Sequence, residues 1–268
     1  EAISRIMEGA ASPAQIGAFL MGLRMKGETL EELAGAAEAM RRFAAPVTTS
    51  RRPLLDTCGT GGDGKQTVNV STATALVAAA CGVAVAKHGN RSVSSRSGSA
   101  DVLEAAGVRI DLTPEQMGAC LDETGFAFLF APALHKSMGH AAAPRREMRL
   151  RTLFNLLGPL TNPAQAEYQL LGVYDPAKAG LIAGALRLLG TRRAWVVHGL
   201  DGLDELSIAG DSVVLAVEGG RIEERRVGPE AAGLPRTPAG AAAGGDPEEN
   251  ARWLESLLAG EARDPSRD

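Results

Sequence analysis

Residues 54–64 read LLDTCGTGGDG, a short apolar run that leads directly into a loop with four glycines. Glycine lets the backbone approach an anion closely, because it has no side chain and tolerates positive φ. A polar helix start follows at residues 69–72, so peptide N–H groups at that helix terminus would point toward the same loop. Strand, glycine loop and helix in this order predict an anion-binding turn of an α/β fold. The loop matches neither GxxxxGK[ST] nor GxGxxG.

The sequence on both sides of this loop alternates between short apolar runs and helical segments, which is the pattern of α/β folds. Expected strands lie near 54–56, 83–86, 126–130, 170–173 and 194–197, and a hairpin spans 213–217 and 222–227. Expected helices lie near 70–80, 100–106, 113–125 and 176–189, and a last one follows residue 246. We therefore predict an α/β protein with a mostly parallel central sheet.

Residues before Pro53 show only helical patterns, with helix starts at Ser12-Pro13 and Thr29. Residues 143–165 again look mostly helical. We predict a small α-helical domain of residues 1–48 with an insert at 143–165. The larger α/β domain comprises residues 53–142 and 166–268.

Composition limits the classes of function. The net charge of −4 argues against nucleic-acid binding through bulk charge. No apolar run reaches the length of about 20 residues that spans a membrane. Three cysteines without metal-ligand spacing suit a reducing cytoplasm. Cys58 abuts the glycine loop, but no Cys/His pair is identifiable, so we interpret it as a small buried side chain. Both ends of the chain look trimmed.

Two further polar segments follow expected strands. Residues 87–101 read KHGNRSVSSRSGSAD, and cations, hydroxyls and small residues together suit a pyrophosphate and a sugar. A flexible surface loop is the alternative. Residues 198–207 read HGLDGLDELS, in which Asp204 and Glu205 can hold a hard cation such as Mg²⁺ through waters and substrate phosphates. Two adjacent acids are often only solvated, but ligands gather at the ends of α/β strands.

In this order, the segments resemble the anthranilate phosphoribosyltransferase family of tryptophan biosynthesis, in the nucleoside phosphorylase/phosphoribosyltransferase superfamily. The matching strings are GTGGD, NVST, KHGNRSVSSRSGSAD, RTLFNLLGPLTNPA (residues 151–164) and HGLDGLDELS. The resemblance implies an active site in the cleft between the two domains, a requirement for Mg²⁺ and a homodimer formed through the helical domain. It implies transfer of the phosphoribosyl group of 5-phosphoribosyl 1-pyrophosphate (PRPP) to the amine of anthranilate, with release of pyrophosphate.

The resemblance also implies the residues of the site. Those expected to bind the two substrates are Gly59, Gly62, Asp63, Thr67, Asn69, Val70, Ser71, Thr72, Lys87, His88, Gly89, Asn90, Arg91, Ser92, Val93, Ser94, Ser95, Ser99 and Arg145. Asn90 and Arg145 would contact anthranilate, with Arg145 facing its carboxylate. The expected Mg²⁺ ligands are Ser71, Asp204 and Glu205. Lys136-Ser137-Met138 departs from the family pattern, as does Arg149, near which a glycine is usual.

The expected chemistry needs no general base and no covalent intermediate, because the aromatic amine is already a nucleophile. Lys87 and Arg91 are expected to stabilise the charge that develops on the departing pyrophosphate. The alternatives are a pyrimidine nucleoside phosphorylase, a nucleic-acid-binding paralogue without transferase activity and an inactive scaffold. The phosphorylase group resembles KHSTGG where this chain has KHGN, and the paralogue should lack the acidic pair and be net positive. We expect no nucleic-acid or membrane partner.

Overall fold

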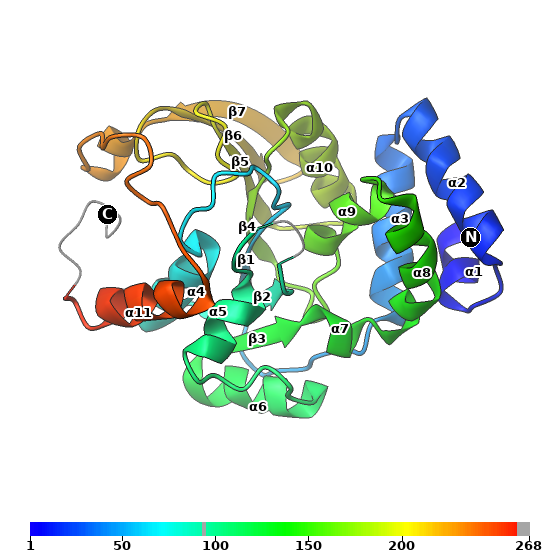
Figure 1. Ribbon diagram of the computed structural model, residues 1–268, viewed down its shortest axis with the longest axis horizontal. Coiled ribbons are helices and arrows are strands. Elements are labelled where there is room, and N and C mark those ends of the chain that lie inside the picture. Colours follow the sequence, from blue (N-terminus) through cyan, green and yellow to red (C-terminus); the bar gives the residue numbers. More distant parts are fainter. Residues whose placement is uncertain (93–94, 262–268) are drawn as a thin grey trace.

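The computed structural model describes residues 1–92 and 95–261, and its strands form one sheet with the order β3-β2-β1-β4-β5-β6-β7 (Figure 1). The strands are β1 (Leu54–Gly59), β2 (Ala84–Gly89), β3 (Phe126–Phe130), β4 (Tyr168–Gly172), β5 (Arg193–Gly199), β6 (Ser212–Glu218) and β7 (Arg221–Val227). The first five strands in this order are parallel, and β6 and β7 continue the sheet as an antiparallel hairpin. The predicted α/β class and mostly parallel sheet are confirmed.

Strand β2 runs past the predicted end of its strand at residue 86. Lys87 and His88 pair with Phe128 and Leu129 of β3, so the ladder continues to Gly89. The apolar pattern ends at residue 86, three residues before the end of the strand, because Lys87 and His88 are polar, although both are buried. The sequence therefore placed Lys87 in a loop, whereas the structure places it inside the sheet.

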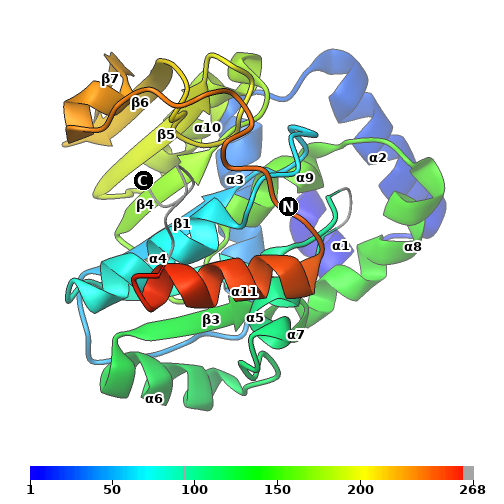
Figure 2. The ribbon, with the colours of Figure 1, turned by 60° about the vertical axis from the view of Figure 1, so that its left-hand side comes forward.

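Helices cover both faces of the sheet. They are α4 (Val70–Ala80), α5 (Ser99–Ala105), α6 (Pro114–Thr124), α7 (Ala131–Leu134), α10 (Pro176–Leu188) and α11 (Pro247–Leu258), with 3₁₀ turns η1 (Lys136–Met138), η2 (Gly158–Leu160) and η3 (Pro229–Ala232). Successive strand residues point to opposite faces. Ala127 packs in the core under α6, whereas Phe128 packs in the core under α4, α5 and α11. Figure 2 shows α11 beside α4 and α5 on this second face.

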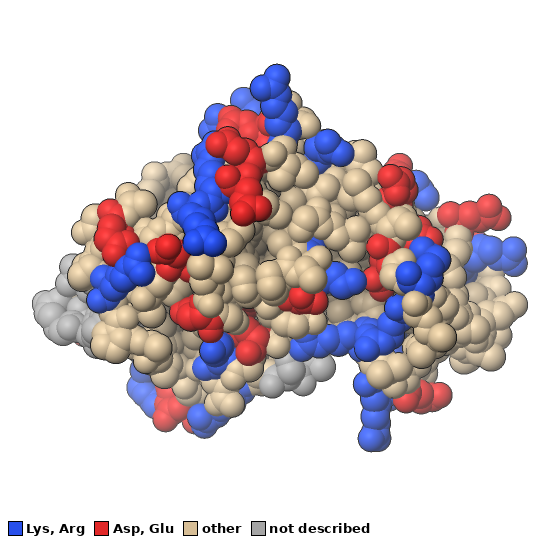
Figure 3. Space-filling view, turned by 90° about the horizontal axis from the view of Figure 1, so that it is seen from above, with Lys and Arg blue, Asp and Glu red and all other residues tan. Residues whose placement is uncertain are grey.

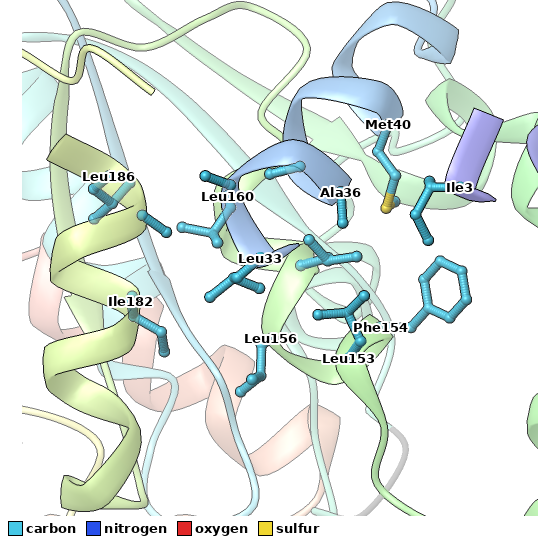
Figure 4. Packing of buried hydrophobic residues seen from close by; sticks show 14 of the residues in the cluster. Ile3, Leu33, Ala36, Met40, Leu153, Phe154, Leu156, Leu160, Ile182 and Leu186 are labelled. Carbon is cyan, nitrogen blue, oxygen red and sulfur yellow. The ribbon is translucent and has the colours of Figure 1, made fainter. Parts of the chain in front are cut away.

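A group of helices from two parts of the chain packs beside the sheet. They are α1 (Ala2–Met7), α2 (Pro13–Lys26), α3 (Leu30–Phe43), α8 (Gly139–Met148) and α9 (Leu153–Leu157). Helix α2 packs on α8, and α3 packs on both α9 and α10. In Figure 4, Leu33 of α3, Leu156 of α9 and Ile182 of α10 point into one shared core. This core joins the helical group to the sheet, so the two sides of the cleft described below are held together by buried apolar contacts.

Local signals fix where several helices begin. Ser12, Thr29 and Thr113 each accept a hydrogen bond from the third helical residue, and each of those residues reaches back to the cap. Gly125 ends α6 in the left-handed conformation at φ 80°. Among the described residues no helix is long and apolar enough to cross a membrane.

Candidate active site

The carboxyl ends of the central strands open onto a cleft of about 1400 Å³. The chain reverses its direction of strand addition between β1 and β4, and ligands of open α/β sheets bind at such a switch point. The sheet side of the cleft is formed by the glycine loop after β1, the first turn of α4 and the end of β2. The opposite wall is formed by α2, α8 and the residues before α9. A second hollow of about 520 Å³, near residues 187–193 and 218–220, contains none of the predicted site residues.

Most of the predicted site residues lie around this one cleft. Those that line it are Gly59, Gly62, Asn69, Ser71, Lys87, His88, Gly89, Asn90, Arg91, Ser92, Ser95, Ser99, Arg145, Asp204 and Glu205. Asp63, Thr67, Val70 and Thr72 are not in the lining, and Val93 and Ser94 lie outside the described residues. Segments separated by more than a hundred residues are therefore brought to one edge of the sheet.

The glycine loop is held against the acidic pair. Asp204 accepts a hydrogen bond from the backbone N–H of Gly61 at 2.9 Å. A Cβ on Gly59 would stand 2.9 Å from the same carboxylate, so only glycine fits there without displacing Asp204. On the opposite side, Gly62 has φ 89° and lies against the guanidinium of Arg151. The loop therefore presents backbone rather than side chains to the cleft.

Three carboxylates meet behind this loop. Burial raises the pKa of Asp204 to about 6, and the neighbouring charge of Asp63 adds to the effect. Burial, together with the charge of Asp204, raises the pKa of Glu205 to about 8. Oδ2 of Asp63 is buried without a hydrogen-bond partner among the described residues. Buried carboxylates that lie close together favour the binding of a metal cation, the uptake of a proton or contact with a cationic side chain.

The donors at this place fit Mg²⁺ better than a metal that needs a complete protein cage. Within the described parts of the chain, no group of three or more His, Cys, Asp or Glu side chains is arranged to hold a metal ion. Mg²⁺ commonly takes one or two carboxylates and completes its shell with waters and substrate phosphates. Asp204 and Glu205 both line the cleft, where phosphate oxygens could supply the remaining ligands.

The first turn of α4 joins the glycine loop to β2. Asn69 occupies the N-cap position of α4, but its side chain makes no capping hydrogen bond. Ser71 accepts a hydrogen bond from Nζ of Lys87 at 3.1 Å, and its backbone N–H donates to Glu205. The hydroxyl of Thr72 is fully buried without a partner among the described residues. The three polar residues of this turn therefore have three different environments, and none is used as a cap.

Lys87 is the buried cation of the site. It is only 1% exposed, and its Nζ donates to the carbonyl of Thr57 at 2.5 Å as well as to Ser71. Burial lowers its pKa, while the negative charges of Asp56 and Glu205 oppose that change. Its ammonium group thus lies near Asp56 and Glu205, where it balances negative charge that would otherwise be unpaired.

Two histidines are packed beneath the basic segment. Nε2 of His88 lies 3.2 Å from Nε2 of His135, and Nδ1 of His88 lies 3.2 Å from the carbonyl of Gly158. Burial lowers the pKa of His88 to about 3, with the charge of His135 adding to the effect, and burial lowers the pKa of His135 to about 4. Both rings are therefore neutral near pH 7 and are occupied by contacts within the protein.

Arg91 leads the part of the basic segment that follows β2. Its guanidinium pairs with Asp101 at 3.0 Å and with Glu104 at 2.8 Å, and it lies 5.8 Å from the ring centre of Phe130. The carbonyl of Asn90 accepts a hydrogen bond from Ser99 at 3.3 Å. In this structure the charge of Arg91 is thus already balanced by two carboxylates, unlike that of the arginines across the cleft.

The opposite wall carries several arginines that form no ion pair within the described residues. Arg145 of α8 is half-buried 5.2 Å from the ring centre of Phe154, and burial lowers its pKa. Arg149 ends α8 with φ 50° and ψ 31°, a left-handed conformation that is uncommon outside glycine. Of these arginines, the sequence assigned only Arg145 to the site.

Arg151 is a cleft residue that the sequence reasoning did not single out. Its guanidinium donates to the carbonyl of Gly62 at 3.3 Å and lies 4.1 Å from the ring centre of Tyr174. Its own carbonyl accepts a hydrogen bond from Arg24 of α2. Arg151 therefore connects α2, the insert and the glycine loop. The string beginning RTLFN was noted, but nothing in it indicates a contact with residue 62.

Comparisons with known proteins identify relatives of this chain. Two family models match the chain: "Glycosyl transferase family, helical bundle domain" over residues 1–44 and "Glycosyl transferase family, a/b domain" over residues 51–268. Anthranilate phosphoribosyltransferase of Moorella thermoacetica is 56% identical over 268 residues, which is 100% of this chain and 79% of that protein. The same enzyme of Symbiobacterium thermophilum is 55% identical over 267 residues, 100% of this chain and 78% of the relative.

Solved structures of anthranilate phosphoribosyltransferases also resemble this chain. Anthranilate phosphoribosyltransferase from Thermus thermophilus superposes with a TM-score of 0.93 at 49% identity, covering 99% of this chain and 79% of that one. The enzyme from Saccharomyces cerevisiae in complex with PRPP and Mg superposes with a TM-score of 0.89 at 30% identity, covering 99% of this chain and 77% of that one.

Proposed function

This chain belongs to the anthranilate phosphoribosyltransferase family, and we propose that its cleft joins anthranilate to PRPP with the residues assigned below. The activity is transfer of the phosphoribosyl group to the amine of anthranilate, with release of pyrophosphate. The observation that carries the assignment is the convergence of the glycine loop, the α4 turn and the acidic pair at one cleft. Each feature alone is compatible with a structural role.

The sheet side of the cleft binds PRPP. The Gly59–Gly62 loop lets phosphate oxygens approach the backbone closely, and the N-terminus of α4 presents the positive end of its dipole to them, whereas the N–H groups of Thr60 and Gly61 already donate to Gly172 and Asp204. Lys87 places its ammonium group directly behind Ser71. Phosphate binding at a helix N-terminus next to a lysine needs no rearrangement of the strands, because these elements are already fixed by the sheet.

Mg²⁺ is bound by Asp204 and Glu205, with Ser71 nearby through its contact with Glu205. Once bound, Mg²⁺ would offset the negative charge that develops on the leaving pyrophosphate. Support comes from the mutual repulsion of the carboxylates and from the yeast relative, which was solved with PRPP and Mg. Burial, with the neighbouring negative charges adding to it, raises the pKa of both acids, so a bound divalent cation would stabilise their ionised forms.

The arginine wall binds anthranilate. The guanidinium of Arg145 is half-buried in that wall. Among the described residues Arg145 has no acidic neighbour within hydrogen-bond distance, so the carboxylate of a substrate is a suitable partner for it. The Saccharomyces cerevisiae relative has been solved with 4-fluoroanthranilate. The carboxylate would be held at Arg145 while the amine, next to it on the ring, faces the ribose carbon.

The reaction is a displacement at the anomeric carbon of the ribose. The bond from that carbon to the amine nitrogen forms, the bond to the pyrophosphate oxygen breaks with its electron pair, and the amine loses one proton to solvent water. His88 and His135 are buried, neutral and occupied, so neither is placed to accept that proton. Charge stabilisation and positioning of the two substrates therefore carry the catalysis.

Two properties of the assembly belong to the same proposal. A homodimer through the helical domain is supported by the exposed side chains of Met21 and Met25 on α2, which are 38% and 77% exposed. A nucleic-acid partner is disfavoured because Lys and Arg are interspersed with Asp and Glu over most of the face in Figure 3, as the net charge of −4 suggests. Sedimentation of the purified protein tests the dimer; a monomer at micromolar concentration would contradict it.

One assay tests the activity. The fluorescence of anthranilate should fall when the protein, PRPP and Mg²⁺ are all present. It should stay constant when any one of them is omitted or when EDTA is added. Uridine with inorganic phosphate serves as the control for phosphorylase activity and should yield no uracil. Loss of anthranilate that does not depend on PRPP, or phosphorolysis of uridine, would contradict the proposed function.

A further inference from the structure

Asn69 does not use its side chain in the way its position suggests. Asparagine at an N-cap normally accepts a hydrogen bond from a backbone N–H of the first helical turn. Here the amide instead contacts two other segments. Its Nδ2 donates to the carbonyl of Ser97 at 3.2 Å, and its Oδ1 accepts from the hydroxyl of Ser97 at 3.3 Å. The same Oδ1 also accepts from Nδ2 of Asn250 at 2.9 Å. Asn69 therefore takes its orientation from outside α4.

Asn250 is the less expected of these partners, because it lies 181 residues away in the first half of α11. It is only 2% exposed, although it is polar. Its Oδ1 accepts a hydrogen bond from the backbone N–H of Gly245 at 2.8 Å. This contact requires the oxygen to face the backbone, so the nitrogen must face Asn69. Both ends of the Asn250 amide are thus satisfied in only one orientation.

The segment before α11 is attached to the glycine loop region by backbone contacts. The N–H of Val68 donates to Ala242 at 2.9 Å, and the N–H of Gly244 donates to Gln66 at 2.8 Å. Thr67 and Ala243 form the bridge between these two pairs. A Cβ on Gly244 would collide with the backbone of Thr67, so this close approach depends on glycine. Figures 1 and 2 show the segment passing from the β7 side of the molecule to α11.

We propose that Asn250 is a positioning residue for PRPP. It fixes the side chain of Asn69 and, through Asn69, ties the start of α4 to the basic segment at Ser97. Asn250 does not line the cleft, so it acts only through Asn69, which does. The inference rests on the proposed function, because it gives Asn69 a role in binding PRPP.

The test compares two substitutions in the same helix. Asn250→Ala removes both hydrogen bonds, and we expect it to raise the KM for PRPP by about tenfold, as expected for the loss of one or two buried hydrogen bonds. The KM for anthranilate should change by less than about twofold, because Asn250 contacts only the PRPP side. Leu254→Ala is the control, since Leu254 is 2% exposed in the core beneath α11 and does not touch Asn69. This variant should have a lower melting temperature, but its KM for PRPP should not rise relative to its KM for anthranilate.

A double-substitution cycle distinguishes positioning from general damage. In an Asn69→Ala background, Asn250→Ala should raise the KM for PRPP by less than about twofold, because its target is gone. If Asn250→Ala does not fold, Asn250→Asp gives the same comparison, since it keeps the acceptor for Gly245 and loses the donor to Asn69. Equal changes in both KM values, or full additivity with Asn69→Ala, would overturn the inference. A wild-type protein that does not consume anthranilate would overturn the proposed function instead.

Discussion

The two walls of the cleft are built in different ways. On the sheet side, two charged side chains near the glycine loop are held by backbone groups: Asp204 accepts from the N–H of Gly61, and Lys87 donates to the carbonyl of Thr57. On the opposite wall, Arg145 and Arg149 project from one short helix and form no ion pair within the described structure. The sheet side is thus preorganised for a highly charged substrate, whereas the opposite wall holds free charge for a smaller one.

This difference predicts which substitutions change kcat and which change a KM. A preorganised site lowers the energy of the transition state, so damage on the sheet side should reduce kcat. A wall of single side chains contributes mainly to binding, so damage there should raise a KM. The substitutions below test that separation, beginning with the largest effect.

Removing the acidic pair should have the largest effect on activity. The double substitution Asp204→Asn and Glu205→Gln should lower kcat by about 10³-fold, because Mg²⁺ would lose both carboxylates. In EDTA the same variant should be more stable than the wild type by about 1 kcal/mol, because repulsion among Asp63, Asp204 and Glu205 is removed. Urea denaturation and steady-state kinetics measure the two effects. Glu223→Gln, an exposed carboxylate of β7, is the control. Equal loss of stability and activity would show that the acids are structural.

Lys87→Ala should reduce both turnover and stability. The substitution leaves Asp56 and Glu205 without their cationic neighbour, so we expect a loss of about 3 kcal/mol in unfolding free energy. We expect kcat to fall by about 100-fold, since a buried charge behind the phosphates is lost. Lys65→Ala, an exposed lysine of the same glycine-rich region, is the control and should retain activity. A folded Lys87→Ala protein with near-normal kcat would refute the role assigned to this lysine.

Arg145→Ala should act mainly on the second substrate. Loss of its contact with the carboxylate should raise the KM for anthranilate by about tenfold and leave the KM for PRPP within about twofold. Initial rates with each substrate varied in turn measure this separation. Arg42→Ala, an exposed arginine of α3, is the control. An increase confined to the KM for PRPP would reverse our assignment of the two walls.

The fold and the sheet side of the site could be predicted because their signals are local. The glycine loop lies at the end of an apolar run, and the Asp204-Glu205 pair follows another, so each motif marks the carboxyl end of a strand. Lys87 was placed in a loop because its polarity ends the apolar pattern. Its burial depends on pairing with Phe128 of β3, which lies 41 residues further along the chain, so the sequence pattern could not reveal it.

The contacts of Arg151 and Asn250 could not be predicted for a related reason. Each pairs with a backbone or side-chain group that is close only after folding: Arg151 with Gly62, and Asn250 with Asn69. An arginine in a basic stretch and an asparagine in the first half of a helix are both ordinary on a surface. Side-chain identity shows that such residues can form hydrogen bonds, but only the tertiary structure shows with which partners.

Arg149→Gly should have the smallest effect and tests whether the charge of this residue matters. Glycine removes the left-handed strain of Arg149 but adds chain entropy to the unfolded state, so we expect a net gain of about 0.5 kcal/mol in stability. Arg149 lines the cleft mouth, but the half-buried Arg145 is the better-placed partner for a carboxylate. The KM for anthranilate should therefore rise by less than about threefold, in keeping with an exposed charge. Arg149→Asn, which also tolerates the left-handed conformation, removes the charge with less change in chain entropy. If both variants raise this KM tenfold, recognition of the acceptor extends along the whole arginine wall rather than resting on Arg145.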